Sequence, residues 1–307
     1  RTLDGSPDMA LTAREIKRVN RLLLAWYQLS ARRLKIRERS DPYAVLVVEV
    51  MAQQTQISRV DVFAEKFLRR FPTLRALARA ETADVLEAWR GLGYNRRALL
   101  LHRAAEAAEA LGGIPTEVEA LQELPGIGPY TARAVAAIAG DGREIPVDVN
   151  IARVVQRLVG GRRLTPTQLQ VAANTFGEHL KRGEAGRWAQ AAMDLASSTC
   201  RAVRPDCVTC PLRSVCRSEG RVRPTQKKRT APLSARFETT QRWLRGRLLD
   251  ELRDAGVTGV RVRGSRGVHD AAAVRSAITR LAGEGLAEQI ESGAYRLPRR
   301  TSGKGPR

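Results

Sequence analysis

The residues that point most clearly to chemistry are the four cysteines of the chain, Cys200, Cys207, Cys210 and Cys216. They form one C-x6-C-x2-C-x5-C array, so four thiolates can converge on a single centre. Both a tetrahedral zinc ion and a [4Fe–4S] cluster accept four cysteine ligands. Disulfides are not expected, because residues 1–7 are polar and lack the apolar segment of a secretion signal. The array therefore predicts a metal centre, and its single C-x2-C hook differs from the two hooks of most zinc ribbons.

Two carboxylates stand in apolar sequence, where an acid is unusual. Glu49 lies between Val48 and Val50, and Asp148 lies between two valines before an expected helix. Burial would raise the pKa of Glu49 and keep it protonated, which suits a general acid; a core glutamate paired with an arginine is the alternative. Asp148 can be a helix N-cap or a reactive carboxylate. The residues alone leave both questions open.

A glycine-containing turn, L-P-G-I-G-P-Y-T, runs from Leu124 to Thr131. Gly126 and Gly128 allow a tight turn with positive φ and the close approach of a phosphate. The helix expected after the turn, residues 129–139, begins with proline, and its free N–H groups favour an anion. Alone, the string fits an ordinary connection between helices. Beside the cysteine array, it is typical of a helix-hairpin-helix that binds DNA without sequence specificity.

These residues are expected on a succession of short amphipathic helices. Apolar residues recur at helical spacing, breakers such as Asp41-Pro42 separate the segments, and alanine-rich stretches favour helix. Strand patterns are nearly absent before residue 255, so the body of the chain is predicted to be all-α. The expected helices of the body are residues 11–30, 43–55, 60–71, 82–90, 96–111, 118–124 and 129–139.

The composition changes towards the C-terminus. Residues 221–307 hold 20 Lys and Arg against 8 Asp and Glu, which is more than half of the net charge of +21. Residues 221–236 are interpreted as a basic linker. Residues 237–300 are interpreted as a small α+β winged-helix-like module, because two expected helices precede a β-hairpin that turns near Gly293. Residues 301–307 are expected to form a disordered tail.

The net charge of +21 predicts a polyanionic partner, with nucleic acid as the leading candidate. A solvated surface from an arginine-rich proteome is the alternative that charge alone leaves open. No apolar run reaches the roughly 18 residues of a membrane span. We therefore expect a monomer without a membrane segment that binds double-stranded DNA and acts in the cytoplasm, in association with the bacterial nucleoid.

The cysteine array at the end of a helical body, the hairpin and Asp148 together resemble the endonuclease III family of helix-hairpin-helix DNA glycosylases. The resemblance implies a six-helix barrel domain over residues 35–143 and an iron–sulfur cluster domain formed by residues 1–34 and 144–220. It also implies a [4Fe–4S] cluster, mostly structural, on the four cysteines. Asp148 is then the essential carboxylate that stabilises the oxocarbenium cation formed when an N-glycosidic bond breaks, and Asn150 orients it or binds a phosphate.

A second segment, E-V-M-A-Q-Q-T from Glu49 to Thr55, resembles the E-V-M-x-Q-Q-T segment of mismatch adenine glycosylases. The resemblance implies that Glu49 protonates a ring nitrogen of the purine and that Gln53 or Gln54 wedges into the base stack. It also implies that Tyr94 intercalates beside the opposing damaged guanine. Extrusion of the base is required, because the glycosidic carbon is otherwise inside the duplex. The implied substrate is adenine opposite 8-oxoguanine or guanine.

Tyr130 stands where endonuclease III-type lyases carry a lysine, whose amine forms a Schiff base with the sugar. A tyrosine cannot form that bond. The resemblance therefore implies a monofunctional glycosylase, in which water is the nucleophile and an abasic site is the product. The neighbouring Thr131 is expected to bind DNA together with Gly126 and Gly128.

Three features depart from the adenine glycosylase pattern. Leu34-Lys35-Ile36-Arg37 lacks the Pro and Trp of the element that lines the base pocket, and Asn95 replaces a second tyrosine. The C-terminal part is also too short for the Nudix-like domain that reads 8-oxoguanine. These departures concern the choice of base rather than the chemistry. Asp194, on the helix before the cysteine array, is expected to pair with an arginine.

Two other functions stay open. Thymine or uracil mismatch glycosylases share Tyr130, although they typically carry Arg-Arg where this chain has Gln53-Gln54. A DNA-binding protein that senses lesions without excising them could use the same scaffold. Such a protein would have no need to retain the three residues implied in catalysis, which are Glu49, Asp148 and Asn150.

Overall fold

The computed structural model describes residues 11–161, 163–221, 236–291 and 293–299. The contacts between residues divide the chain into two compact units. The first unit contains Arg1–Glu49, Pro115–Glu123 and Ile127–Lys228, and the second contains Val50–Ile114, Leu124–Gly126 and Arg229–Arg307. Most of the expected linker (221–236) and the whole expected tail (301–307) lie outside the described residues. The expected division into domains therefore stays a prediction.

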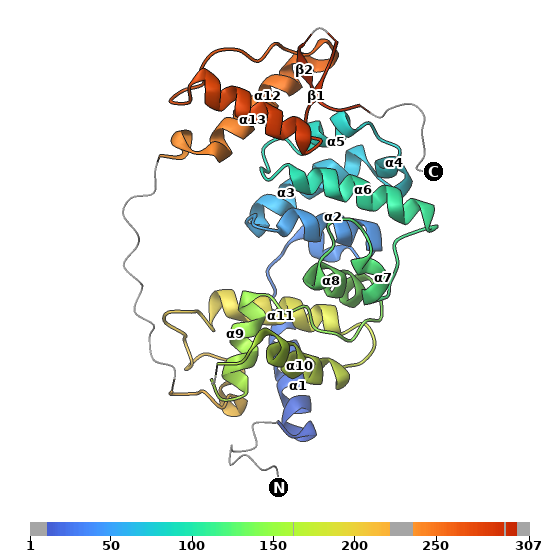
Figure 1. Cartoon of the computed structure of the whole chain (residues 1–307). Helices are drawn as coiled ribbons and strands as arrows, with labels where there is room; N and C mark the ends of the chain where they lie inside the picture. Colours follow the sequence, from blue (N-terminus) through green and yellow to red (C-terminus); the bar gives the residue numbers. More distant parts are fainter. Residues whose placement is uncertain (1–10, 162, 222–235, 292, 300–307) are drawn as a thin grey trace. The chain divides into compact units, whose positions relative to one another are not determined.

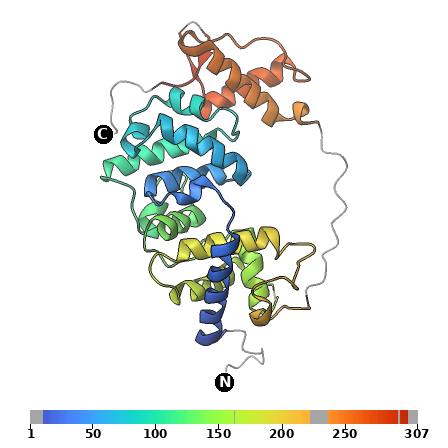
Figure 2. The same cartoon turned by 180° about the vertical axis from the view of Figure 1, so that it is seen from behind.

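The first unit is a bundle of helices around one apolar core. Its helices are α1 (Ala13–Ser30), η1 (Lys35–Glu38), the first part of α2 (Pro42–Ala52), α7 (Val118–Gln122), α8 (Pro129–Ala139), α9 (Val149–Leu158), α10 (Pro166–Glu178), α11 (Ala185–Ser198) and η2 (Arg213–Val215). Helices α1, α9, α10 and α11 lie against one another (Figures 1 and 2). At the centre, Trp188 of α11 stacks on Phe176 of α10 with 5.2 Å between ring centroids. This core holds the start of α9, and with it Asp148, in a fixed place.

The second unit contains the end of α2 and four further helices of the body. These are α3 (Ile57–Arg70), α4 (Leu74–Ala78), α5 (Thr82–Ala88) and α6 (Arg96–Ala110). Their core includes Phe67 of α3 and Trp89, both almost fully buried, whose rings meet edge to face at 5.8 Å. The loop from Gly91 to Tyr94 leaves this core and returns the chain to α6.

The C-terminal module belongs to the same unit and has a mixed α+β structure. Its elements are η3 (Phe237–Thr239), α12 (Gln241–Ala255), η4 (Gly256–Thr258), α13 (Ala271–Gly283), β1 (Glu288–Gln289) and β2 (Tyr295–Arg296). The strands pair antiparallel, and Val260 extends them by a bridge to Tyr295. Asp270 caps α13, because its carboxylate accepts a hydrogen bond of 2.7 Å from the Ala273 amide. The predicted order of helix, helix and hairpin is confirmed.

The all-α prediction for the body is confirmed within the described residues, with small differences at helix ends. Helix α2 ends at Ala52 rather than Thr55, because residues 53–55 form a turn in which the Thr55 amide donates to the Ala52 carbonyl. Helix α5 ends at Ala88 rather than Arg90. Among the described helices, none combines the length and apolar composition of a membrane span.

Candidate active site and cysteine loop

Asp148 is the N-cap of α9. Its Oδ1 accepts hydrogen bonds from the amides of Asn150 (2.9 Å) and Ile151 (2.7 Å), so the N-cap prediction is confirmed. Its Oδ2 accepts from the side-chain amide of Asn150 at 2.7 Å. The capping role does not compete with a reactive role, because these bonds hold the carboxylate in one orientation. The carboxylate also lies at the positive end of the α9 macrodipole.

Glu49 lies half-buried on α2 between the buried Val48 and Val50. Burial is the main cause that raises the pKa of Glu49 to about 7, and the negative charge of Asp148 raises it further. A hydrogen bond from Tyr130 acts in the opposite direction. Besides burial, the groups that affect the pKa of Glu49 are the Asp148 carboxylate and the Tyr130 phenol, and no arginine is among them. The alternative that Glu49 pairs with a structural arginine is therefore not supported.

Tyr130, near the start of α8, completes this group. Burial raises the pKa of Tyr130 far above its usual value, and the negative charges of Glu49 and Asp148 act in the same direction. The phenol therefore stays protonated and donates to the Glu49 carboxylate. The structure thus brings Glu49, Tyr130 and Asp148 together in the first unit, from three different elements.

A chain of hydrogen bonds leads from Asp148 to the first cysteine of the array. Asn150 accepts from Arg153 Nη2 at 3.1 Å, and Arg153 Nε donates to the Cys200 carbonyl at 2.9 Å. Arg157, one helical turn farther along α9, donates to the Cys200 Sγ at 3.1 Å. Neither arginine was predicted from the sequence. Arg153 lies three residues after Asn150, and Arg157 lies four residues after Arg153, and this spacing on one face of a helix was the available signal.

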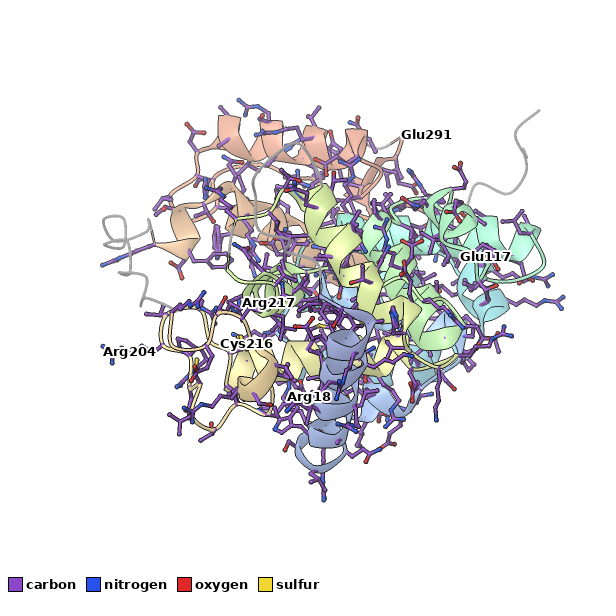
Figure 3. All side chains as sticks on the ribbon, turned by 90° about the horizontal axis from the view of Figure 1, so that it is seen from below. Arg18, Glu117, Arg204, Cys216, Arg217 and Glu291 are labelled. Atoms are coloured by element: carbon purple, nitrogen blue, oxygen red, sulfur yellow. The ribbon has the colours of Figure 1, made fainter. Side chains whose placement is uncertain are left out.

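The four cysteines line one small cavity in the loop after α11. The pKa of the Cys210 thiol rises to about 11, mainly through burial, and the three other cysteines raise it further, which shows how closely the four thiols lie. Among the residues that the structure describes, no three His, Cys, Asp or Glu side chains converge tightly enough for one metal ion. Figure 3 shows Cys216 beside Arg217, and Arg204 at the outer edge of this loop.

The two glycines of the hairpin serve different purposes. Gly126 has a φ of +78°, and a Cβ atom there would lie 2.7 Å from the Leu100 Cβ, so only glycine fits. Gly128 is the N-cap of α8 with a φ of −88°, which corrects the expectation that it needs positive φ. A Cβ atom at Gly128 would meet open space. Pro129 occupies the first turn as expected, and Thr131 is buried.

The other predicted DNA-binding residues lie in the second unit, where Arg97 joins their two loops. Its guanidinium donates to the carbonyls of Val50 (3.0 Å) and Met51 (2.8 Å), to the Thr55 hydroxyl (3.2 Å) and to the Gly93 carbonyl (3.2 Å). This buried arginine was not predicted from the sequence. Gln53, Gln54, Thr55 and Tyr94, which the resemblance assigned to DNA, all line one cavity with it.

The segment with the atypical base-pocket sequence forms η1, where Arg37 meets Asp194. Arg37 donates to both carboxylate oxygens of Asp194, at 2.7 and 2.8 Å, and Arg32 donates at 2.6 Å. The Asp194 side chain is only 2% exposed. Burial acts to raise the pKa of Asp194, but the bonds from the two arginines outweigh it and lower the pKa. The expected pairing of Asp194 with an arginine is confirmed.

Comparison with known proteins agrees with this arrangement. Residues 47–177 match the HhH-GPD superfamily of base excision DNA repair proteins. An adenine DNA glycosylase from Mycobacterium tuberculosis is 41% identical over 239 residues, which cover 76% of this chain and 78% of the relative. One from Mycolicibacterium smegmatis is 37% identical over 281 residues, or 90% of this chain and 94% of the relative.

A comparison of folds gives the same architecture. The structure of a thermostable thymine-DNA glycosylase superimposes with a TM-score of 0.62, over 68% of this chain and 98% of that one. The sequence identity is 22%, so this likeness bears on the fold alone. The helix-hairpin-helix glycosylase fold expected from the sequence is confirmed.

Proposed function

Because the chain belongs to the HhH-GPD superfamily of base excision DNA repair proteins, and within it to the adenine DNA glycosylases, we propose that it hydrolyses the N-glycosidic bond of an adenine extruded from double-stranded DNA. The observation that carries this proposal is the group formed by Glu49, Tyr130 and Asp148. It places a carboxyl with a pKa near 7 beside an anchored carboxylate.

Glu49 and Asp148 have complementary roles in base release. About half of the Glu49 carboxyl groups are protonated near pH 7, and the protonated form can donate to a ring nitrogen of adenine, which makes the base a better leaving group. As the bond breaks, positive charge develops on the sugar, and the ionised Asp148 stabilises it. Asn150 and the α9 amides hold the Asp148 carboxylate still, so little reorganisation is needed.

The nucleophile in this proposal is water. Tyr130 carries no amine, so it cannot form a Schiff base with the sugar, and its raised pKa keeps the phenol neutral. Its hydroxyl is occupied by the hydrogen bond to Glu49 and positions that carboxyl. The product is an abasic site, and strand cleavage is left to another enzyme or to alkali.

The choice of adenine as the excised base rests on a residue pair that differs between adenine glycosylases and thymine or uracil mismatch glycosylases. Gln53-Gln54 matches the adenine branch, whereas thymine and uracil mismatch glycosylases typically carry Arg-Arg there. The relatives from Mycobacterium tuberculosis and Mycolicibacterium smegmatis also bear the adenine name. We infer that the preferred opposing base is guanine or 8-oxoguanine, because Tyr94 matches the tyrosine that intercalates beside it.

The cysteine loop fits a [4Fe–4S] cluster better than a zinc ion. The four thiols line one cavity, and the C-x6-C-x2-C-x5-C array has a single C-x2-C hook rather than the two hooks of most zinc ribbons. When bound, such a cluster supplies a structural anchor for the loop rather than a reacting group. Arg157 Nη1 lies 3.1 Å from the Cys200 Sγ, so its positive charge would offset part of the negative charge of a thiolate-bound cluster.

DNA is the partner that this arrangement requires. The cysteine loop carries the exposed Arg201 and Arg204, which suit backbone phosphates, and the exposed Arg213, which pairs with Glu219 at 3.0 Å. The N-terminus of α8, which has open space at Gly128, offers amide donors to a further phosphate. We propose that a monomer binds a mismatched duplex and acts on chromosomal DNA in the cytoplasm. We also propose that residues 35–143 form the six-helix barrel domain, residues 1–34 and 144–220 the cluster domain, and residues 237–300 the C-terminal module.

One panel of duplexes tests the proposed function. The protein is incubated with duplexes that contain A:8-oxoG, A:G, T:G or U:G, and abasic sites are then cleaved with alkali. We expect release of adenine from the first two pairs and loss of release in Asp148→Asn, with DNA binding retained. Release of thymine or uracil alone would favour the mismatch alternative. If the wild-type protein binds DNA but frees no base, it is a lesion-sensing binding protein instead.

A further inference from the structure

The C-terminal module forms part of a cavity in the second unit whose lining does not include Glu49, Tyr130 or Asp148. The cavity measures about 1080 Å³. One wall consists of the turn at residues 53–56 and the loop at residues 91–97, and the other consists of α12 with residues just after α13. Its size is sufficient for a nucleotide.

The first wall holds two side chains on unfavourable backbone. Gln54 has a φ of 56° and Tyr94 a φ of 47°, and they are the two non-glycine residues with positive φ in the described part of the chain. Such conformations are costly for residues with a side chain and are concentrated at sites that clamp a ligand. Tyr94 is also 38% exposed, so its ring is not buried in the core. Both observations indicate a binding wall.

Two guanidinium groups lie over the Tyr94 ring. Arg97 is 5.5 Å from the ring centroid, and Arg242 of α12 is 4.1 Å from it. A guanidinium that stacks on a ring uses its face for this contact, while its N–H groups point outward in the plane and can donate to a ligand. Arg242 thus brings a planar set of donors to the edge of an aromatic platform.

The second wall is held firmly against the body of the unit. Arg253 of α12 is 3% exposed and donates to the Leu86 carbonyl and to the Asn95 Oδ1, both at 2.9 Å. Asp254 pairs with Arg90 at 3.0 Å. Arg242 therefore occupies a defined place beside Tyr94.

We propose that this cavity receives the nucleotide opposite the excised base, and that Arg242 is a specificity-determining residue that selects guanine or 8-oxoguanine there. This inference rests on the proposed function. Both bases present the O6 acceptor, to which a guanidinium donates, whereas adenine and cytosine present an amino donor at the same place. Glu284, which pairs with Arg245 at 2.6 Å in the same cavity, can accept from the N1–H of either guanine base.

Equilibrium binding tests this assignment without the need for base release. The Asp148→Asn protein is titrated, by fluorescence anisotropy, with duplexes that differ only in the base opposite adenine, which is guanine, 8-oxoguanine or cytosine. We expect at least about tenfold tighter binding with either guanine base than with cytosine, and we expect Arg242→Ala to remove most of that preference. Arg242→Lys should restore little of it, because lysine keeps the charge but not the planar donors.

Arg247→Ala is the matched control, because Arg247 lies on the same helix, is exposed and pairs with Glu251 outside the cavity. It should weaken binding to all duplexes equally. Absence of a preference in the parent protein, a preference that survives Arg242→Ala, or an equal loss of preference in Arg247→Ala would each overturn the inference. Failure of the proposed function is seen separately, as the absence of base release by the wild-type protein.

Discussion

The hydrogen bond from Tyr130 to Glu49 gives a prediction that can be worked out in numbers. If protonated Glu49 is the general acid, with its pKa near 7, about 90% of the protein is competent at pH 6 and about 10% at pH 8. The rate of base release should therefore fall about tenfold between pH 6 and pH 8. The Tyr130 hydroxyl stabilises the charged carboxylate and lowers this pKa, so Tyr130→Phe should raise it.

The size of the shift follows from the strength of one hydrogen bond to a charged group. Such a bond contributes about 1.5–3 kcal/mol, and partial access of water to Glu49 reduces this to about one pKa unit. In Tyr130→Phe about half of the acid is then protonated at pH 8, roughly five times the wild-type fraction. The descending limb of the pH profile should move to higher pH by about one unit.

Single-turnover kinetics with excess enzyme over pH 5.5–9 measures this limb without interference from product release. Glu49→Gln serves as the control, because it has no carboxyl to titrate and its residual rate should lose the limb near pH 7. A wild-type rate that stays constant across this range would refute the role of Glu49 as the acid. A profile of Tyr130→Phe that moves to lower pH would refute the account of the hydrogen bond.

Three further outcomes follow from the structure. Asp194→Asn should lower the free energy of unfolding, measured with urea, by about 3–5 kcal/mol, because it removes a buried carboxylate and leaves Arg37, which is 14% exposed, without its charge partner. Asp84→Asn, in an exposed pair, should cost less than about 1 kcal/mol. Because its pKa is lowered in the folded protein, Asp194 stabilises the fold above the pKa it has in the unfolded chain, and this stabilisation is lost as the pH falls through the pKa of the folded state. A difference in the free energy of unfolding between wild type and Asp194→Asn that stays the same at every pH would contradict this. Gly126→Ala should lower the melting temperature, because the added Cβ would lie too close to Leu100. Gly128→Ala should keep the melting temperature of the wild type and weaken DNA binding. Equal melting temperatures for the two variants would show that Leu100 does not restrict position 126 to glycine. Cys210→Ala should remove the absorbance near 400 nm that a [4Fe–4S] cluster gives, and a colourless wild-type protein that contains zinc would overturn the cluster assignment.

The sequence contained the chemistry of the site but not the contacts that tune it. Glu49 and Asp148 stood out because each is an acid in an apolar run, but the roles proposed for them and for Tyr130 came from the resemblance to the glycosylase family. The mutual effect of these three groups depends on how α2, α8 and α9 pack, and no local pattern encodes that packing. Arg97 was missed for the same reason, since it donates to the carbonyls of Val50 and Met51, 47 and 46 residues away, and to the Thr55 hydroxyl, 42 residues away.

Net charge was a good guide to the partner and a poor guide to the surface that binds it. Residues 221–307 carry most of the charge, yet residues 236–299 hold 12 Lys and Arg against 8 Asp and Glu. Several of these arginines form ion pairs within the module, as Arg266 does with Glu251 and Arg296 with Glu288. A charge that is neutralised locally does little to attract DNA. Arg242, which lies on an aromatic ring beside a cavity, is therefore a stronger indication of a DNA contact than the density of charge around it.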